Sequence, residues 1–249
     1  MPTLLIIGGT GFFGKSILDA YKRGLLSPWN IDKVIAMSRN ATKLEFKHPE
    51  LILDTVELLD GDISTVNFLP KSDYVIHAAA STNVSRYLRH NEEEKQNIIK
   101  GTLNYCRLAP KFHKNCKIVF CSSGAIYGYQ SKKVRYLTEG MAFGNIEKLD
   151  EVKKSYAYAK RDAELAIQKL GQVGLNVSVA RCFSFIGKYL PRDQHFAIGN
   201  FIADGLAGKD INVKADRKVY RSYMYADDLV KWLMTLAENA NPKCPIYNV

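Results

Sequence analysis

A glycine-rich turn between an apolar segment and a helical pattern constrains the fold of this chain more than any other feature. Thr3–Ile7 predicts a buried strand, and residues 12–23 carry apolar side chains at helical spacing. In the turn that joins them, Gly8 permits a tight bend, Gly11 lets the backbone approach a pyrophosphate, and Gly14 allows close packing of the helix on the strand. Free N–H groups and the helix dipole favour phosphate at this place. The turn therefore predicts a dinucleotide-binding site.

The segments that follow alternate between short apolar runs and longer helical patterns. Strands that are apolar almost throughout predict an α/β fold, a Rossmann-type doubly wound parallel sheet with helices on both faces. We expect a dinucleotide-binding domain over residues 1–180. Its further strands are predicted at residues 33–37, 56–59, 74–78, 117–121 and 176–180, and its longer helices at 92–108 and 155–170, the second with Ser155 as its cap.

The pattern loosens after residue 180, where we expect a smaller substrate-binding region over residues 181–249 that is interleaved with the first domain. Within it we predict a helix at residues 196–206, a short strand at 211–213 and a helix at 226–238. Asp227 and Asp228 precede apolar residues of the last helix, so we interpret them as N-terminal caps rather than catalytic acids.

Ser38 and Arg39 stand at the end of the second predicted strand, where NAD-binding proteins usually place a carboxylate for the ribose 2′-hydroxyl. No carboxylate is present there to repel a 2′-phosphate, and Arg39 can pair with one. This pattern favours NADP over NAD, although an exposed arginine is common at a strand end. Asp62, after the third strand, either faces the adenine amino group or caps its own turn.

Tyr156 and Lys160 are four residues apart on a predicted helix, so both side chains project from one face. Ser122 and Ser123 end the predicted fifth strand, at the sheet edge where such folds bind ligands. A tyrosine phenol has a pKa of about 10, and a neighbouring ammonium group and a positive nicotinamide lower that pKa. With Ser123 holding a substrate oxygen against Tyr156, the tyrosine can exchange a proton while hydride passes between substrate and cofactor.

Several motifs together resemble the extended short-chain dehydrogenase/reductases. They are GGTGFFG at residues 8–14, His77 followed by three alanines, Asn97 before a Gly-Thr pair, SSGAIYG at residues 122–128, and Tyr156 with Lys160. Residues 181–187 (RCFSFIG) and 221–228 (RSYMYADD) resemble the nucleotide-sugar epimerase/dehydratase branch of that family. The resemblance covers essentially the whole chain.

This resemblance implies an NAD(P)-dependent enzyme acting on a nucleotide-diphosphate sugar, with Ser123, Tyr156 and Lys160 as the catalytic set. It also implies that Asn97 supports the active-site helix, that Arg221 reaches the substrate diphosphate, and that the chain forms a homodimer through residues 92–108 and 155–170. The predicted cofactor-binding residues are Gly8, Thr10, Gly11, Phe12, Phe13, Gly14, Ser38, Arg39, Asp62, Ile63, Ala78, Ala79, Ala80, Asn97, Tyr156 and Lys160. The predicted substrate-binding residues are Ser81, Ser123, Ser184 and Arg221.

The chain departs from the family pattern at several positions. The 4,6-dehydratases of the family carry an Asp-Glu pair directly after the catalytic hydroxyl residue, and Gly124 and Ala125 stand there instead. Neither can act as an acid or a base, which disfavours a dehydratase. Ser184 replaces the usual asparagine of the RxFN motif and weakens its assignment to a substrate phosphate. Members of the family continue beyond the point that corresponds to residue 249, so part of the substrate region is expected to lie there.

The leading hypothesis is an epimerase that oxidises and re-reduces a ring carbon of a nucleotide sugar. An alternative is an NADPH-dependent 4-ketoreductase of a keto sugar or other carbonyl, which Ser38 and Arg39 favour. A second alternative is a regulator that senses NAD(P) without turnover, and the presence of both Tyr156 and Lys160 argues against it.

Bulk properties restrict the partners and the compartment. The net charge of +10 comes from scattered basic residues, so we favour small polyanionic ligands or a generally basic surface over nucleic acid. The five cysteines have neither metal-ligand spacing nor a paired motif, so we predict no metal site and reduced thiols in a cytoplasmic protein. No apolar segment approaches the length of a membrane helix, and residues 4–7 are too short for a secretory signal.

Overall fold

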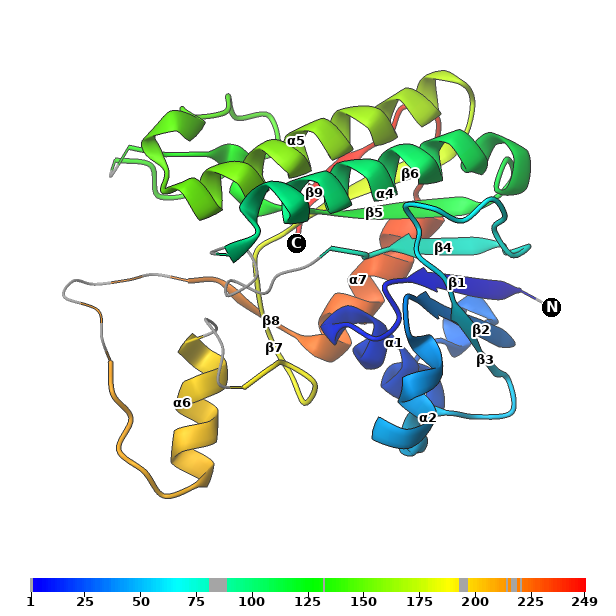
Figure 1. The fold of residues 1–249 in the computed structure, drawn as a ribbon, viewed down its shortest axis with the longest axis horizontal. Helices are drawn as coiled ribbons and strands as arrows, with labels where there is room; N and C mark the ends of the chain where they lie inside the picture. The colour runs from blue at the N-terminus through cyan, green and yellow to red at the C-terminus, as the bar shows by residue number, and fades with distance from the viewer. Residues whose placement is uncertain are drawn as a thin grey trace.

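The computed structural model of the chain describes residues 2–80, 89–131, 133–192, 197–213, 215, 219 and 221–249. In this part of the chain, the main feature is a seven-stranded parallel sheet with the strand order β3-β2-β1-β4-β5-β6-β9 (Figure 1). Its strands are β1 (Thr3–Ile7), β2 (Lys33–Ser38), β3 (Val56–Asp60), β4 (Tyr74–His77), β5 (Lys117–Ser123), β6 (Asn176–Cys182) and β9 (Ile246–Asn248).

Helices cover both faces of this sheet, with α4 and α5 side by side on one face and α1 and α7 on the other (Figure 1). The helices are α1 (Phe12–Lys22), α2 (Leu44–Lys47), α4 (Asn91–Phe112), α5 (Glu151–Gln172), α6 (Ala197–Leu206) and α7 (Ala226–Glu238). Shorter 3₁₀ turns lie at Ser27–Trp29, Ala41–Lys43, Pro49–Leu51, Gly124–Tyr127 and Ile146–Lys148.

The central strand β1 shows how the sequence produces these two layers. Its side chains alternate between the faces, because successive residues of a strand point in opposite directions. Leu4 and Ile6 join the core beneath α1 and α7, whereas Leu5 and Ile7 join the core beneath α4 and α5. All four are almost fully buried. The predicted doubly wound α/β fold is confirmed.

The order of strands reverses between β1 and β4, since β2 and β3 follow on one side of β1 and β4, β5 and β6 on the other. In open α/β sheets, ligands bind at such a reversal, outside the carboxyl ends of the strands. The glycine turn follows β1 at this edge, and residues 78–80 follow β4 beside it. The topology therefore places the two segments opposite each other.

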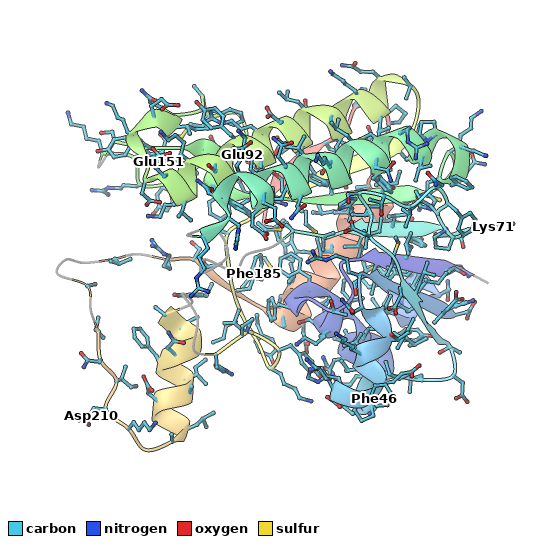
Figure 2. All side chains as sticks on the ribbon, viewed as in Figure 1. Phe46, Lys71, Glu92, Glu151, Phe185 and Asp210 are labelled. Atoms are coloured by element: carbon cyan, nitrogen blue, oxygen red, sulfur yellow. The ribbon has the colours of Figure 1, made fainter. Side chains whose placement is uncertain are left out.

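The chain after residue 182 first leaves the sheet and then returns to it. Strand β7 (Ser184–Ile186) pairs in parallel with β8 (Tyr223–Tyr225), and α6 stands apart from the large sheet (Figure 1). Phe185 of β7 packs against Phe12 and Phe13 at the start of α1. In Figure 2 it lies between α6 and the large sheet. The chain then returns through helix α7, which packs against the large sheet, to strand β9, which pairs with β6.

Three local predictions are wrong. Helix α5 begins at Glu151 rather than at residue 155, because Oδ1 of Asp150 accepts the Lys153 N–H at 2.9 Å and caps it one turn earlier. Residues 211–213 form no strand, since they have no ladder partner among the described residues. Neither Asp227 nor Asp228 caps α7, because the helix begins at Ala226 and both lie within its first turn. The Asp227 carboxylate instead accepts two hydrogen bonds from Arg23 of α1, at 3.0 and 2.5 Å.

Among the described residues, no helix combines the length and the apolar character that crossing a membrane requires.

Candidate active site

A cavity of about 300 Å³ opens at the carboxyl edge of the sheet, between the glycine turn after β1 and the residues after β4. Gly8 has a φ of +103°, which favours glycine, and a Cβ there would lie 2.9 Å from the backbone of Ala78 and Ala79. Two independent constraints thus require glycine at this position. Gly14 is required for a different reason, because its Cβ would come within 2.3 Å of the Gly9 carbonyl oxygen.

Most of the predicted cofactor-binding residues line this cavity. They are Gly8, Thr10, Gly11, Ser38, Arg39, Asp62, Ile63, Ala78, Ala79, Ala80 and Asn97. Phe12, Phe13, Gly14, Tyr156 and Lys160 lie outside this lining. The first three instead hold α1 in place, the two aromatic rings against Phe185 and the glycine against Gly9.

Six further lining residues were not predicted from the sequence as cofactor-binding: Ile7, Met37, Asn40, Gly61, Glu94 and Ile98. Helical spacing could have found two of them. Glu94, Asn97 and Ile98 lie at positions i, i+3 and i+4 of α4 and therefore share one face.

The far end of the cavity is formed where β2 and β3 end. The Ser38 hydroxyl is buried there and has no hydrogen-bond partner among the described residues. An orphaned buried hydroxyl is costly unless a ligand pairs with it. Asp62 Oδ1 accepts hydrogen bonds from the N–H and the hydroxyl of Ser64, at 2.9 and 2.7 Å, so it caps its turn while it also lines the cavity. These residues, with the glycine cradle, fit a dinucleotide.

Lys160 is buried on the inner face of α5, beneath the end of β5. Its Nζ donates a hydrogen bond to the Cys121 carbonyl oxygen at 2.9 Å and lies 5.9 Å from the centre of the Tyr156 ring. Burial lowers the pKa of Lys160 from its ordinary value. The ammonium group is therefore held under the tyrosine, with its position fixed by the backbone of β5.

The side chains of Tyr156 and Ser123 lie next to each other between α5 and the end of β5. Ser123 Oγ accepts the Ala125 N–H at 3.1 Å, which leaves its own hydrogen for the tyrosine oxygen. Burial raises the pKa of Tyr156 to about 12, although the neighbouring Ser123 hydroxyl opposes that rise. The structure thus brings together all three predicted catalytic side chains, with a phenol that is protonated at neutral pH.

The predicted substrate-binding residues are only partly brought together. Ser184 opens β7, where it pairs in register with Tyr223 of β8, and the exposed Arg221 precedes that strand by two residues. Ser81 lies outside the described residues. Gly124 packs against Phe183, whose ring would lie 2.7 Å from a Cβ at residue 124. The aromatic ring therefore fills the space that a longer side chain would need after Ser123.

Other ligand classes find less support at the described positions. No group of three or more His, Cys, Asp or Glu side chains there is arranged to hold a metal ion. A doubly wound sheet, a glycine cradle at its reversal point and a Ser–Tyr–Lys set beside it define a Rossmann-type dinucleotide-binding protein of the short-chain dehydrogenase/reductase class.

Comparison with known proteins makes this class more specific. The chain belongs to the NAD dependent epimerase/dehydratase family, whose model matches residues 4–249. It is 29% identical over 239 residues to UDP-glucuronic acid decarboxylase 6 of Arabidopsis thaliana, covering 94% of this chain and 66% of that protein. It is 24% identical over 251 residues to UDP-glucuronate 4-epimerase 4 of the same plant, covering 96% and 54%. The chain thus spans less than two thirds of the length of these relatives.

Solved structures share the fold. A UDP-N-acetylglucosamine 4-epimerase from Methanobrevibacter ruminantium M1, in complex with UDP-N-acetylmuramic acid, superimposes with a TM-score of 0.81 at 22% identity, covering all of this chain and 76% of that one. The dTDP-glucose 4,6-dehydratase DesIV from Streptomyces venezuelae, solved with NAD bound, gives a TM-score of 0.79 at 22% identity, covering 99% and 75%. The architecture of the large sheet is therefore that of known nucleotide-sugar enzymes.

Proposed function

We propose that this chain is the cofactor-binding and catalytic part of an enzyme that epimerises a nucleotide-diphosphate sugar through hydride transfer at a ring carbon. The observation that carries the proposal is that Tyr156, Ser123 and Lys160 lie together at the end of β5, with the buried Lys160 ammonium beneath the tyrosine ring. Relatives named as nucleotide-sugar epimerases and decarboxylases support the same substrate class.

Each of the three side chains has a distinct task in this chemistry. A bound nicotinamide dinucleotide supplies the hydride acceptor and donor. Ser123 holds the substrate oxygen, and the Tyr156 oxygen exchanges a proton with it as a general acid or base. The phenol must first be brought down from a pKa of about 12, so the positive charge of Lys160 stabilises the phenolate while the proton is away.

The residues directly after Ser123 help to distinguish between the candidate reactions. Elimination of water would need a second acid or base, and Gly124 and Ala125 have none to offer. Among the described residues, the Phe183 ring occupies the space beside Gly124. Reactions that need only one proton-transfer group at this turn, epimerisation or carbonyl reduction, are therefore favoured.

A coupled assay distinguishes these two reactions. We expect the enzyme, supplied with oxidised cofactor and a panel of UDP- and dTDP-hexoses, to form the epimer of one of them without net change in absorbance of the reduced cofactor. Steady consumption of NADPH with a 4-keto nucleotide sugar, and no epimer, would establish the ketoreductase instead. Cofactor binding without either reaction would contradict an enzymatic role and support a sensing one.

Arg39 and Ser38 support NADP as the preferred cofactor, although DesIV, which shares the fold, was solved with NAD. Replacing Arg39 with alanine is expected to raise the Kd for NADP by about 10- to 100-fold, the loss of one charge-assisted hydrogen-bonding group. The Kd for NAD should change by less than about threefold. Binding titrations of both cofactors measure this, with Arg107→Ala on the outer face of α4 as the control. Equal losses for NAD and NADP would contradict the assignment.

We also propose the homodimer that the family resemblance implies, formed through α4 and α5. Leu103 of α4 and Leu165 of α5 support it, because their side chains are 53% and 58% exposed on the two helices that lie side by side. Burial of such apolar surface favours association.

A further inference from the structure

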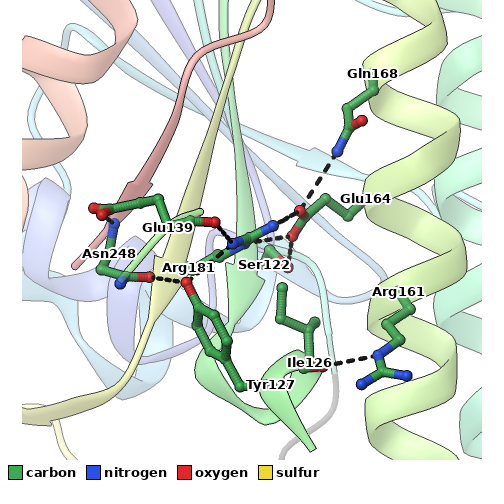
Figure 3. A network of polar contacts seen from close by, with 9 residues as sticks. All are labelled: Ser122, Ile126, Tyr127, Glu139, Arg161, Glu164, Gln168, Arg181 and Asn248. Carbon is green, nitrogen blue, oxygen red and sulfur yellow. Dashed lines mark hydrogen bonds and ion pairs between the residues drawn. The ribbon is translucent and has the colours of Figure 1, made fainter. Parts of the chain in front are cut away.

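A buried ion pair joins α5 to β6, and neither of its side chains belongs to the lining of the cofactor cavity. Figure 3 shows this pair with its polar partners. Arg181 of β6 and Glu164 of α5 approach to 2.6 Å, and each side chain is only 4% exposed. Glu164 follows Lys160 by one helical turn, while Arg181 is the register partner of Ser122 in the neighbouring strand. The pair therefore connects the helix that carries Tyr156 to the strand that ends in Ser123.

Further hydrogen bonds extend this pair to both ends of the turn that contains Ser123. The Ser122 hydroxyl donates to Glu164 Oε2 at 2.8 Å. Arg181 Nη1 donates to Tyr127 Oη at 2.9 Å, and Tyr127 Oη donates to Asn248 Oδ1 of β9 at 2.7 Å (Figure 3). The residues on either side of Ser123–Ile126 are thus fixed from one buried centre.

Stability alone gives little reason for this arrangement. Burying two charges costs about as much as their attraction returns, and well-packed apolar residues in their place are often neutral or more stable. The charged groups instead add geometric specificity, because each of their hydrogen bonds restricts an angle as well as a distance. Arg181 also donates to the Glu139 carbonyl oxygen at 3.0 Å, so four segments besides its own strand take their positions from these two side chains.

We propose that Glu164 and Arg181 are positioning residues that, through Ser122 and Tyr127, hold the Ser123 hydroxyl in place beside Tyr156. The proposal rests on the proposed function, since it assigns these residues to the geometry of the proton-transfer pair. A misplacement of about 1 Å in such a pair can lower the rate about 100-fold. In this role the network acts on turnover through Ser123, since neither Glu164 nor Arg181 lines the cofactor cavity.

The decisive variant replaces both charges, Glu164→Leu with Arg181→Met, which removes the positioning bonds without leaving a lone buried charge. We expect kcat to fall about 10- to 100-fold while KM, the Kd for the cofactor and the Tm stay close to wild type. Tyr127→Phe, which removes only the bonds to Arg181 and Asn248, should lower kcat in the same direction and by less. Glu151→Gln breaks the exposed pair with Lys154 on the same helix and serves as the control.

Hydrogen exchange provides a measurement that does not depend on substrate. We expect faster exchange in the double variant at residues 122–128, with β1 as protected as in the wild type. Uniformly faster exchange, or an unchanged kcat in the folded double variant, would overturn the positioning role. If the double variant does not fold, the same two readouts on Tyr127→Phe decide the matter. A wild-type chain without turnover on any sugar would contradict the proposed function, whereas the exchange result would still test the network.

Discussion

Replacing Tyr156 with phenylalanine is expected to lower kcat by about 100- to 10,000-fold, the range over which a single general acid–base group contributes to catalysis. The substitution removes only the phenolic oxygen, which lies beside Ser123, and keeps the ring that lies over Lys160. We therefore expect the Kd for the cofactor and the free energy of unfolding to change little. Initial rates at saturating substrate, together with a thermal melt, measure both effects.

The same helix provides a matched control for this experiment. Tyr158 lies two residues further on, points outward and donates a hydrogen bond to Glu147 at 2.6 Å. Tyr158→Phe also removes one tyrosine oxygen from α5, but on the solvent side, so its kcat should stay within about twofold of wild type. Full activity in Tyr156→Phe would show that another group moves the proton.

Acid should destabilise the folded chain strongly through His77, which is 1% exposed between Tyr105 and Phe120. Burial, with a smaller contribution from the charge of Lys160, lowers the pKa of His77 to about 3, against an unfolded value of 6.5. At a pH between these two values, His77 is therefore protonated in the unfolded chain and neutral in the folded chain. The contribution to stability is complete above pH 6.5 and is lost as the pH falls towards 3, by up to about 5 kcal/mol.

Urea unfolding between pH 8 and pH 4 measures this effect. In His77→Leu, the free energy of unfolding should fall less steeply over this interval, because no proton is taken up at residue 77 on unfolding. His90→Gln removes a histidine whose side chain is 57% exposed and should leave the slope as in wild type. Parallel curves for wild type and His77→Leu would mean that the imidazole is protonated in the folded chain.

The large sheet could be predicted from the sequence because its strands are buried on both faces. A strand such as Thr3–Ile7 then needs apolar residues throughout, and the next helical pattern marks its end. The same logic fails for β7, β8 and β9, which have three residues each and carry no such run. Their pairing depends on distant partners, and local sequence does not encode those partners.

In the candidate site, too, some residues could be predicted from the sequence and others could not. Gly8, Tyr156 and Lys160 stand at spacings set by a turn and by one helix, so sequence alone relates them to each other. Arg181 also occurs in a family motif, but nothing in the sequence couples it to Glu164, because that contact joins a strand to a helix through the core. The roles of Ser184 and Arg221 stay predictions, since each depends on where a substrate lies.

Strand β9 has a consequence for how the chain is made. Asn248 accepts the Tyr127 hydroxyl across 121 residues of sequence, and β9 pairs with the edge of β6. While the chain leaves the ribosome, β6 therefore keeps an open edge until residue 248 has been synthesised, and an open edge is a template for aggregation. Contacts over so long a separation also form slowly. The catalytic turn therefore lacks the hydrogen bond from Tyr127 to Asn248 until the last strand of the sheet has been synthesised and has paired with β6.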